Sequence, residues 1–231
     1  MLTSFGFDTI AIHVNRYNSN FIETINFFYS LGIKNFLLIF DYDPLQDSLS
    51  IIKSRMNEFK KLYKPSVRGK LKCAVNLHIS PGSGFNDTVD QIYCNKRSRA
   101  LLSTLPLFPD KNYDQISHDI NNLLYKKSTS LFFASFDKTV ESSSLEFCSK
   151  FINNPRISLT VDINYLFNPQ KQPFFNNILT HSCPVIPSIS QDISYYVGIA
   201  EYINFAIENY GKKDYFRLCS QINKASDKIF N

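Results

Sequence analysis

Short apolar runs alternate with amphipathic stretches along the chain. The runs FDTIAIHV and NFLLIF are dominated by β-branched and aromatic residues, which is typical of buried strands. Between them, FIETINFFYSLG follows Asn20 in a capping-box-like arrangement with Glu23 and ends at Gly32, which predicts a helix. A second helix is expected from about Asp47 to Tyr63, with its charged residues on the solvent side.

The same alternation continues through the rest of the chain. Further strands are predicted at KLKCAVNLHI, RALLSTLPLF, SLFFASF, ISLTVDINYLF and PVIPSIS, each followed by a helical stretch, with a terminal helix after a turn from Ser220 to Asn223. Strands separated by single helices favour a parallel sheet with right-handed crossovers. Because GxGxxG and GxxxxGK[ST] do not occur, we favour a closed barrel over an open doubly wound sheet. The prediction is an α/β fold: a single TIM-like (β/α) barrel domain over residues 1–231, with about seven parallel strands.

Composition narrows the class of protein. The 231 residues are 44% hydrophobic and 15% aromatic, which is enough for one sizeable core. A formal charge of +5 permits contact with nucleic acid without requiring it. The five cysteines form no CxxC pair, which favours reduced thiols in an intracellular protein over a zinc or disulfide framework. No signal peptide or membrane helix is recognisable, so we expect a soluble protein without a membrane partner, in the nucleus or the cytoplasm.

Polar residues follow several of the predicted strands. In βα barrels the catalytic side chains gather at the carboxyl ends of the strands, and here those ends carry His13 and Asn15, Asp41 and Asp43, Asn76 and His78, Ser135 and Asp137, Asp162 and Asn164, and Ser188 to Asp192. A hydrolytic metal site needs several imidazoles and carboxylates. One such site would use His13, Asp41, His78 and Asp192, with Asp162 as a further carboxylate, but no HxH or HExxH pair is present. We therefore expect Asp41 and Asp43 to cap the turn and helix that follow them.

Two basic clusters are candidates for RNA contact. Lys96, Arg97 and Arg99 lie near Tyr93, and such a group can neutralise phosphate and stack on a base. The segment KPSVRGK, predicted to be an exposed loop, supplies Lys64, Arg68 and Lys70. Both clusters are equally compatible with ordinary solvated loops.

The strand ends, taken in order, resemble those of the polymerase-and-histidinol-phosphatase (PHP) barrel family. That family carries HxH, TDH, a glutamate and SDxH at successive strand ends, and these bind two or three metal ions. In this sequence IHVN keeps His13, FDYD keeps Asp41 but has Tyr42 in place of histidine, NLHIS offers His78, and PSISQD has no Asp-x-His. A tyrosine is a poor substitute for a histidine ligand, because its hydroxyl has a pKa of about 10.

The chain is also similar to a branch of this superfamily that has lost its metals, the TIM-barrel protein subunit of archaeal and eukaryotic ribonuclease P. The similarity runs from about residue 5 to residue 228 and includes FGFDTIAIHV, GIKNFLLIF, KLKCAVNLHIS, NKRSRALLSTLPLFP and PVIPSISQD. It implies a noncatalytic subunit that supports tRNA 5′ processing, without a cofactor, and whose partners are a structured RNA and other proteins of the particle. The alternatives are a PHP phosphoesterase with altered ligands for Mn, Fe or Zn, and a barrel scaffold that binds only proteins.

Overall fold

The structure is a computed structural model that describes residues 5–14, 21–42, 48–66, 69–77, 101–107, 118, 132–136, 157–167, 176, 179–180, 184–189 and 198–230. The strands in these ranges are β1 (Thr9–Val14), β2 (Asn35–Tyr42), β3 (Lys70–Leu77), β4 (Leu101–Leu107), β5 (Phe132–Phe136), β6 (Ile157–Asp162) and β7 (Val185–Ile189). The helices are α1 (Phe21–Ser30), α2 (Leu49–Ser66), α6 (Ile163–Leu166), α8 (Ile199–Tyr210) and α9 (Lys212–Phe230).

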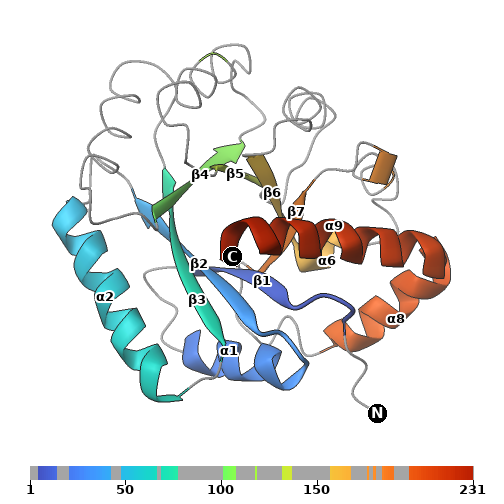
Figure 1. The fold of residues 1–231 in the computed structure, drawn as a ribbon, viewed down its shortest axis with the longest axis horizontal. Helices are drawn as coiled ribbons and strands as arrows, with labels where there is room; N and C mark the ends of the chain where they lie inside the picture. The colour runs from blue at the N-terminus through green and yellow to red at the C-terminus, as the bar shows by residue number, and fades with distance from the viewer. Residues whose placement is uncertain are drawn as a thin grey trace.

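All neighbouring strands pair in parallel, in the order in which they occur along the chain. The ladder runs from β1 to β7, and β7 pairs again with β1, where Ala11 faces Ser188 and Ile12 faces Ile189. The described strands therefore close into a barrel (Figure 1). The predicted α/β class with parallel strands is confirmed.

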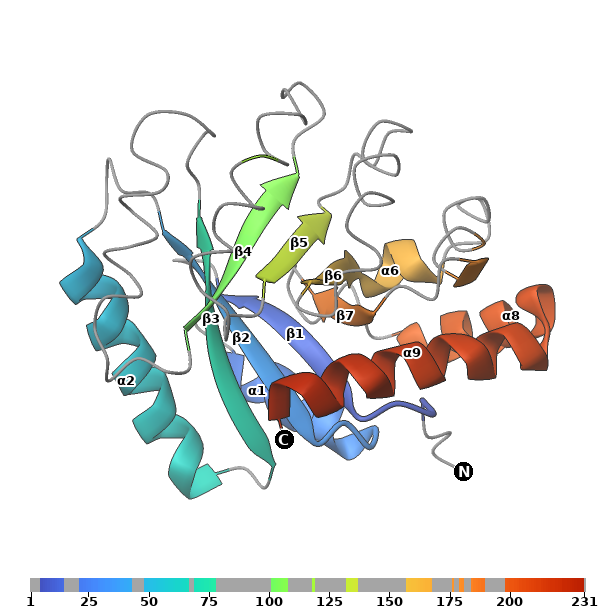
Figure 2. The ribbon, with the colours of Figure 1, turned by 45° about the horizontal axis from the view of Figure 1, so that its top comes forward.

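The interiors of β1, β2 and β7 are buried on both faces, as expected where helices cover the outside of a parallel sheet. In β2 every residue from Phe36 to Phe40 is at most 1% exposed. On the outside, α2 lies beside β2 and β3 in both ribbon views (Figures 1 and 2). Within the described parts of the chain, no helix has both the length and the apolar character needed to cross a membrane.

Two predicted boundaries at the carboxyl ends of strands are wrong. The strand does not end before Asp41, because β2 continues to Tyr42 and pairs Asp41 with Asn76 of β3. The pairing extends the strand beyond its apolar core, since β3 itself runs on to Leu77. The side chain of Asp41 is outside the described part of the structure, so its capping role stays a prediction. The run ISLTVDINYLF is split in the structure: β6 ends at Asp162 and α6 begins at the next residue. Asp43 lies outside the described residues.

The segment KPSVRGK is not one exposed loop. Its first three residues, Lys64 to Ser66, form the end of α2, and Lys70 begins β3. Pro65 lies in the last turn of α2, although proline has no backbone donor and disfavours a helix beyond its first turn.

The terminal helix starts earlier than predicted. α8 ends at Tyr210 and is followed by Gly211, which has a φ of 82°. α9 then runs without interruption through Ser220 and Asn223. The predicted turn is absent because buried residues recur every three or four positions over the whole of α9, forming one continuous apolar side. They are Tyr215, Leu218, Cys219, Gln221, Ile222, Ala225, Ser226, Ile229 and Phe230.

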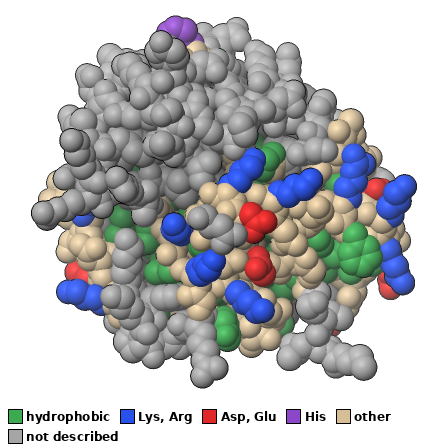
Figure 3. Space-filling view, in the orientation of Figure 1, with side chains coloured by type: hydrophobic (Ala, Val, Ile, Leu, Met, Phe, Trp, Pro, Cys, Tyr) green, Lys and Arg blue, Asp and Glu red, His purple; other side chains and the backbone are tan. Residues whose placement is uncertain are grey.

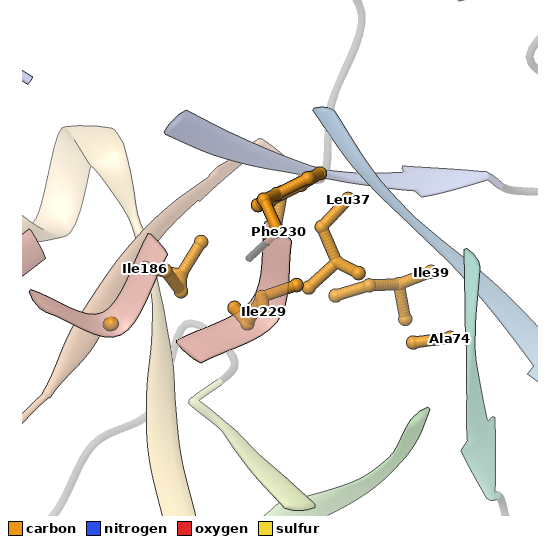
Figure 4. Close-up of a cluster of buried hydrophobic side chains, with 8 residues drawn as sticks. Leu37, Ile39, Ala74, Ile186, Ile229 and Phe230 are labelled. Carbon is orange, nitrogen blue, oxygen red and sulfur yellow. The ribbon is translucent and has the colours of Figure 1, made fainter. Parts of the chain in front are cut away.

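α9 crosses the amino-terminal end of the barrel. Ser226 Oγ is hydrogen-bonded to Thr9 Oγ1, and Asn35 Nδ2 donates to both hydroxyl oxygens at 3.3 Å. Thr9 and Asn35 are the first residues of β1 and β2, so these bonds fix α9 over the strand starts. The last turn of α9 then packs in one cluster with side chains from four strands (Figure 4). The members of this end cluster are Ala11, Leu37, Ile39, Ala74, Ile186, Ala225, Ile229 and Phe230.

The segment before β1 is held against α9 by hydrogen bonds to two of its backbone carbonyls. Tyr215 Oη donates to the carbonyl of Phe5 at 2.6 Å, and Cys219 Sγ donates to the same oxygen at 3.5 Å. Asn223 Nδ2 donates to the carbonyl of Gly6 at 3.4 Å. Burial raises the pKa of Cys219 to about 11, which keeps the thiol protonated as a donor at neutral pH.

A side chain at position 6 should destabilise this junction. Gly6 has a φ of +76°, and a Cβ there would lie 3.1 Å from Cys219 Sγ. We expect Gly6→Ala to lower the free energy of unfolding by about 1–2 kcal/mol from the left-handed backbone alone, with the close contact adding to it. Denaturant unfolding of the purified variant measures the loss.

Gly32→Ala is the matched control. Gly32 also has a positive φ, +99°, but a Cβ at this position would have no neighbouring atom within 4 Å. Gly32→Ala should therefore lower the free energy of unfolding only through its left-handed backbone, without a contact like that with Cys219. A Gly6→Ala variant no less stable than Gly32→Ala would show that the junction with α9 is looser than the structure indicates.

Candidate functional site at the carboxyl end of the barrel

The end cluster identifies which strand positions face the inside of the barrel. Ala11, Leu37, Ala74 and Ile186 contact α9 there, and side chains alternate between the two faces of a strand. Two residues further along β1 and β7, the same face carries His13, which is half-buried, and Ser188, which is 2% exposed.

Strand β6 contributes to the same inner face. Thr160 is paired in register with Ile186, and Asp162 with Ser188. Thr160 is fully buried, and Asp162 is half-buried at the last position of the strand. Among the described residues, Thr160 Oγ1 has no hydrogen-bond partner. This side of the barrel therefore presents hydroxyl and carboxylate oxygens at neighbouring strand ends.

The register of β2 and β3 places two further polar residues at this end of the barrel. His13 is paired with Ile39, and Asp41, two residues after Ile39, is paired with Asn76. For Asp41 and Asn76 the structure describes the backbone and not the side chains. Adjacent strands thus bring His13, Asp41 and Asn76 to one end of the barrel. This is the arrangement expected of polar residues at the carboxyl ends of barrel strands.

The four candidate metal ligands are only partly covered by the structure. His13 and Asp41 lie on adjacent strands, whereas His78 and Asp192 fall outside the described residues. Over the described ranges, no three His, Cys, Asp or Glu side chains gather in a way that could hold a metal ion.

Of the six candidate RNA-binding residues, Lys70 alone has a described side chain. It is exposed at the start of β3, which is the amino-terminal end of the barrel and therefore opposite the polar strand ends. Lys64 belongs to α2, where its backbone alone is described. Arg68, Lys96, Arg97 and Arg99 lie outside the described residues, so their proposed role stays a prediction.

No family model matches the chain, and no curated protein matches it. A solved structure does: the histidinol phosphate phosphatase from Lactococcus lactis subsp. lactis Il1403, complexed with zinc, L-histidinol and phosphate. The match has a TM-score of 0.51 and 11% sequence identity, and it covers 86% of this chain and 93% of that chain. The chain therefore has a fold similar to that of this phosphatase. At this identity the likeness shows the fold alone, and it does not address the resemblance to the ribonuclease P subunit.

Sequence reasoning missed Thr160 and the part played by α9. The signal for Thr160 is the alternation in ISLTVD, where Ser158, Thr160 and Asp162 share one face of the strand. For α9 the signal is the regular recurrence of apolar residues on one side of the helix, which predicts a long buried contact but not the surface that it covers.

Proposed function

We propose that the chain is a noncatalytic, RNA-associated subunit of a ribonuclease P-like ribonucleoprotein that supports tRNA 5′ processing. One observation supports the proposal: among the described strand ends of the barrel, His13, Asp41 and Asp162 are accompanied by the neutral residues Asn76 and Ser188. An amide and a hydroxyl are weak substitutes for the imidazoles and carboxylates that activate a metal-bound water. In this proposal the seven-strand barrel is related to PHP hydrolases but needs no metal cofactor.

The formal charge of +5 and the resemblance described from the sequence support an RNA partner. The partners would be a structured RNA and the other protein subunits of an intracellular particle. The basic residues proposed to contact RNA are Lys64, Arg68, Lys70, Lys96, Arg97 and Arg99.

RNA binding by the purified chain tests this proposal. We expect it to bind a precursor tRNA transcript with a single-stranded 5′ leader, and the logarithm of the affinity to fall linearly with the logarithm of the salt concentration. Filter binding or fluorescence anisotropy at several salt concentrations gives the slope. Absence of binding even at about 50 mM salt would contradict the proposal, because electrostatic RNA contacts are strong under that condition.

A second candidate is a metal-dependent phosphoesterase, favoured by the fold likeness to a phosphatase and by the adjacent strands of His13 and Asp41. Its ligands would be His13, Asp41, His78 and Asp192, holding Mn, Fe or Zn. Elemental analysis separates the two candidates. The RNA-associated subunit should carry less than one such ion per chain, whereas two or more tightly held ions, with phosphatase activity lost in His13→Ala, would establish the enzyme. A barrel that binds only proteins would show neither RNA binding nor bound metal.

A further inference from the structure

The outward side of α9 is strongly basic. Lys213, Arg217, Lys224 and Lys228 are all exposed and are separated by four, seven and four residues, which places them on one side of the helix. From Lys213 to Lys228 this stripe extends about 22 Å at 1.5 Å per residue. Because the opposite side of α9 is buried on the barrel, the stripe is fixed in position.

Basic residues from the strand starts lie at the same end of the barrel. The backbone N–H of Lys34 donates to the carbonyl of Asp8 at 2.8 Å, and that of Lys70 donates to the carbonyl of Lys34 at 3.0 Å. Lys34 and Lys70 are both exposed, at the end where α9 crosses, and Lys72 is half-buried. Figure 3 shows Lys and Arg side chains over α9 and beside it, around a smaller group of acidic side chains.

We define the basic face as α9 together with residues 8, 34, 70 and 72. It contains eight Lys or Arg residues and three acidic ones, Asp8, Asp214 and Asp227. Taking these from the 25 basic and 20 acidic residues of the whole chain leaves 17 of each. The net charge of the chain therefore resides on this face.

An exposed aromatic ring lies at one end of the stripe. Phe216 is 65% exposed, and Lys212 and Lys213 precede it by four and three residues on the helix surface. Its ring packs edge-on against Tyr215 with 6.4 Å between centroids, and the hydroxyl of Tyr215 is anchored to Phe5. An exposed aromatic beside lysines is an arrangement that proteins use to stack a nucleic-acid base while neutralising its phosphates.

We propose that the basic face binds a single-stranded segment of RNA, with Phe216 stacking on one base and the stripe on α9 contacting phosphates. This inference rests on the proposed RNA association and assigns it to a surface opposite the polar strand ends. An anionic membrane is a poorer fit, because a membrane-surface helix inserts its apolar side, and that side of α9 is buried in the protein.

Removing three charges from the stripe tests the assignment. The variant Lys213→Gln, Arg217→Gln, Lys224→Gln should bind the precursor tRNA transcript about 100-fold more weakly at about 0.1 M salt, with a salt slope smaller by about 2, since each phosphate contact contributes about 0.7. The matched control is Lys53→Gln, Arg55→Gln, Lys61→Gln on α2, which removes the same charge elsewhere. We expect the control to bind like the parent chain.

Phe216→Ala tests the stacking separately. It should weaken binding about 5-fold to 100-fold while leaving the salt slope unchanged, because a stacked base contributes without releasing counterions. All the changed α9 residues are exposed, and an unaltered melting temperature verifies that each variant folds.

The outcomes separate this inference from the proposed function. If the parent chain binds no RNA, the proposed function fails and the inference fails with it. If the parent binds and the α9 variant binds equally well, or the α2 control loses as much, the proposed function stands and the assignment to the basic face is overturned.

Discussion

Replacing Ile229 by alanine should lower the free energy of unfolding by about 2–5 kcal/mol, the usual cost of such a cavity in a core. Ile229 is 5% exposed and belongs to the end cluster, where it lies between Ile186 and Leu37 (Figure 4). The barrel wall on either side restricts how far the site can collapse around the missing atoms. Denaturant unfolding, with a constant dependence on denaturant concentration, gives the loss.

Ser220→Ala is the control on the same helix. Ser220 is exposed, so its replacement should change the stability by no more than about 0.5 kcal/mol. If Ile229→Ala cost no more than Ser220→Ala, the last turn of α9 would not be packed inside the end of the barrel.

Leu37→Ala should be similarly costly, at about 2–5 kcal/mol, because Leu37 is fully buried on β2 in the same cluster. The informative quantity is the coupling between the two positions. Residues that share a cavity show interaction energies of about 0.5–3 kcal/mol, so the double variant Leu37→Ala, Ile229→Ala should deviate from the sum of the single variants.

Ile25→Ala provides the uncoupled comparison. Ile25 is also fully buried, but on α1, which lies outside the barrel wall (Figure 2). Combined with Ile229→Ala it should be additive within about 0.5 kcal/mol. If Ile229 showed the same interaction energy with Ile25 as with Leu37, the coupling would not come from a contact shared by Ile229 and Leu37.

The sequence predicts the strand cores well because burial on both faces leaves a strong local pattern, as in NFLLIF and FDTIAIHV. It fails where a distant partner sets the boundary. The apolar run ends before Asp41, yet pairing with Asn76 of β3 continues the strand through it. Ser220 and Asn223 look like a turn, yet the contact of α9 with the barrel keeps them helical.

Some features of the candidate site can also be recognised from the sequence, and others cannot. The sequence identifies His13, Asp41 and Asp162 as strand-end residues, because the apolar runs stop near them. The alternation in ISLTVD places Thr160 on the same face as Asp162, but the sequence does not show that this face points into the barrel. The basic face is not evident from the sequence either, because Lys34 and Lys70 lie far from α9 along the chain and come to the same end of the barrel only in the folded structure.

The most direct test of the central claim, that the barrel acts as a partner of RNA and not as a metal-dependent catalyst, is to recover the chain from its own cells and sequence the RNA bound to it. We expect one stable, structured RNA to be retained in about equimolar amount and to be released by high salt. A chain recovered free of RNA would contradict the account.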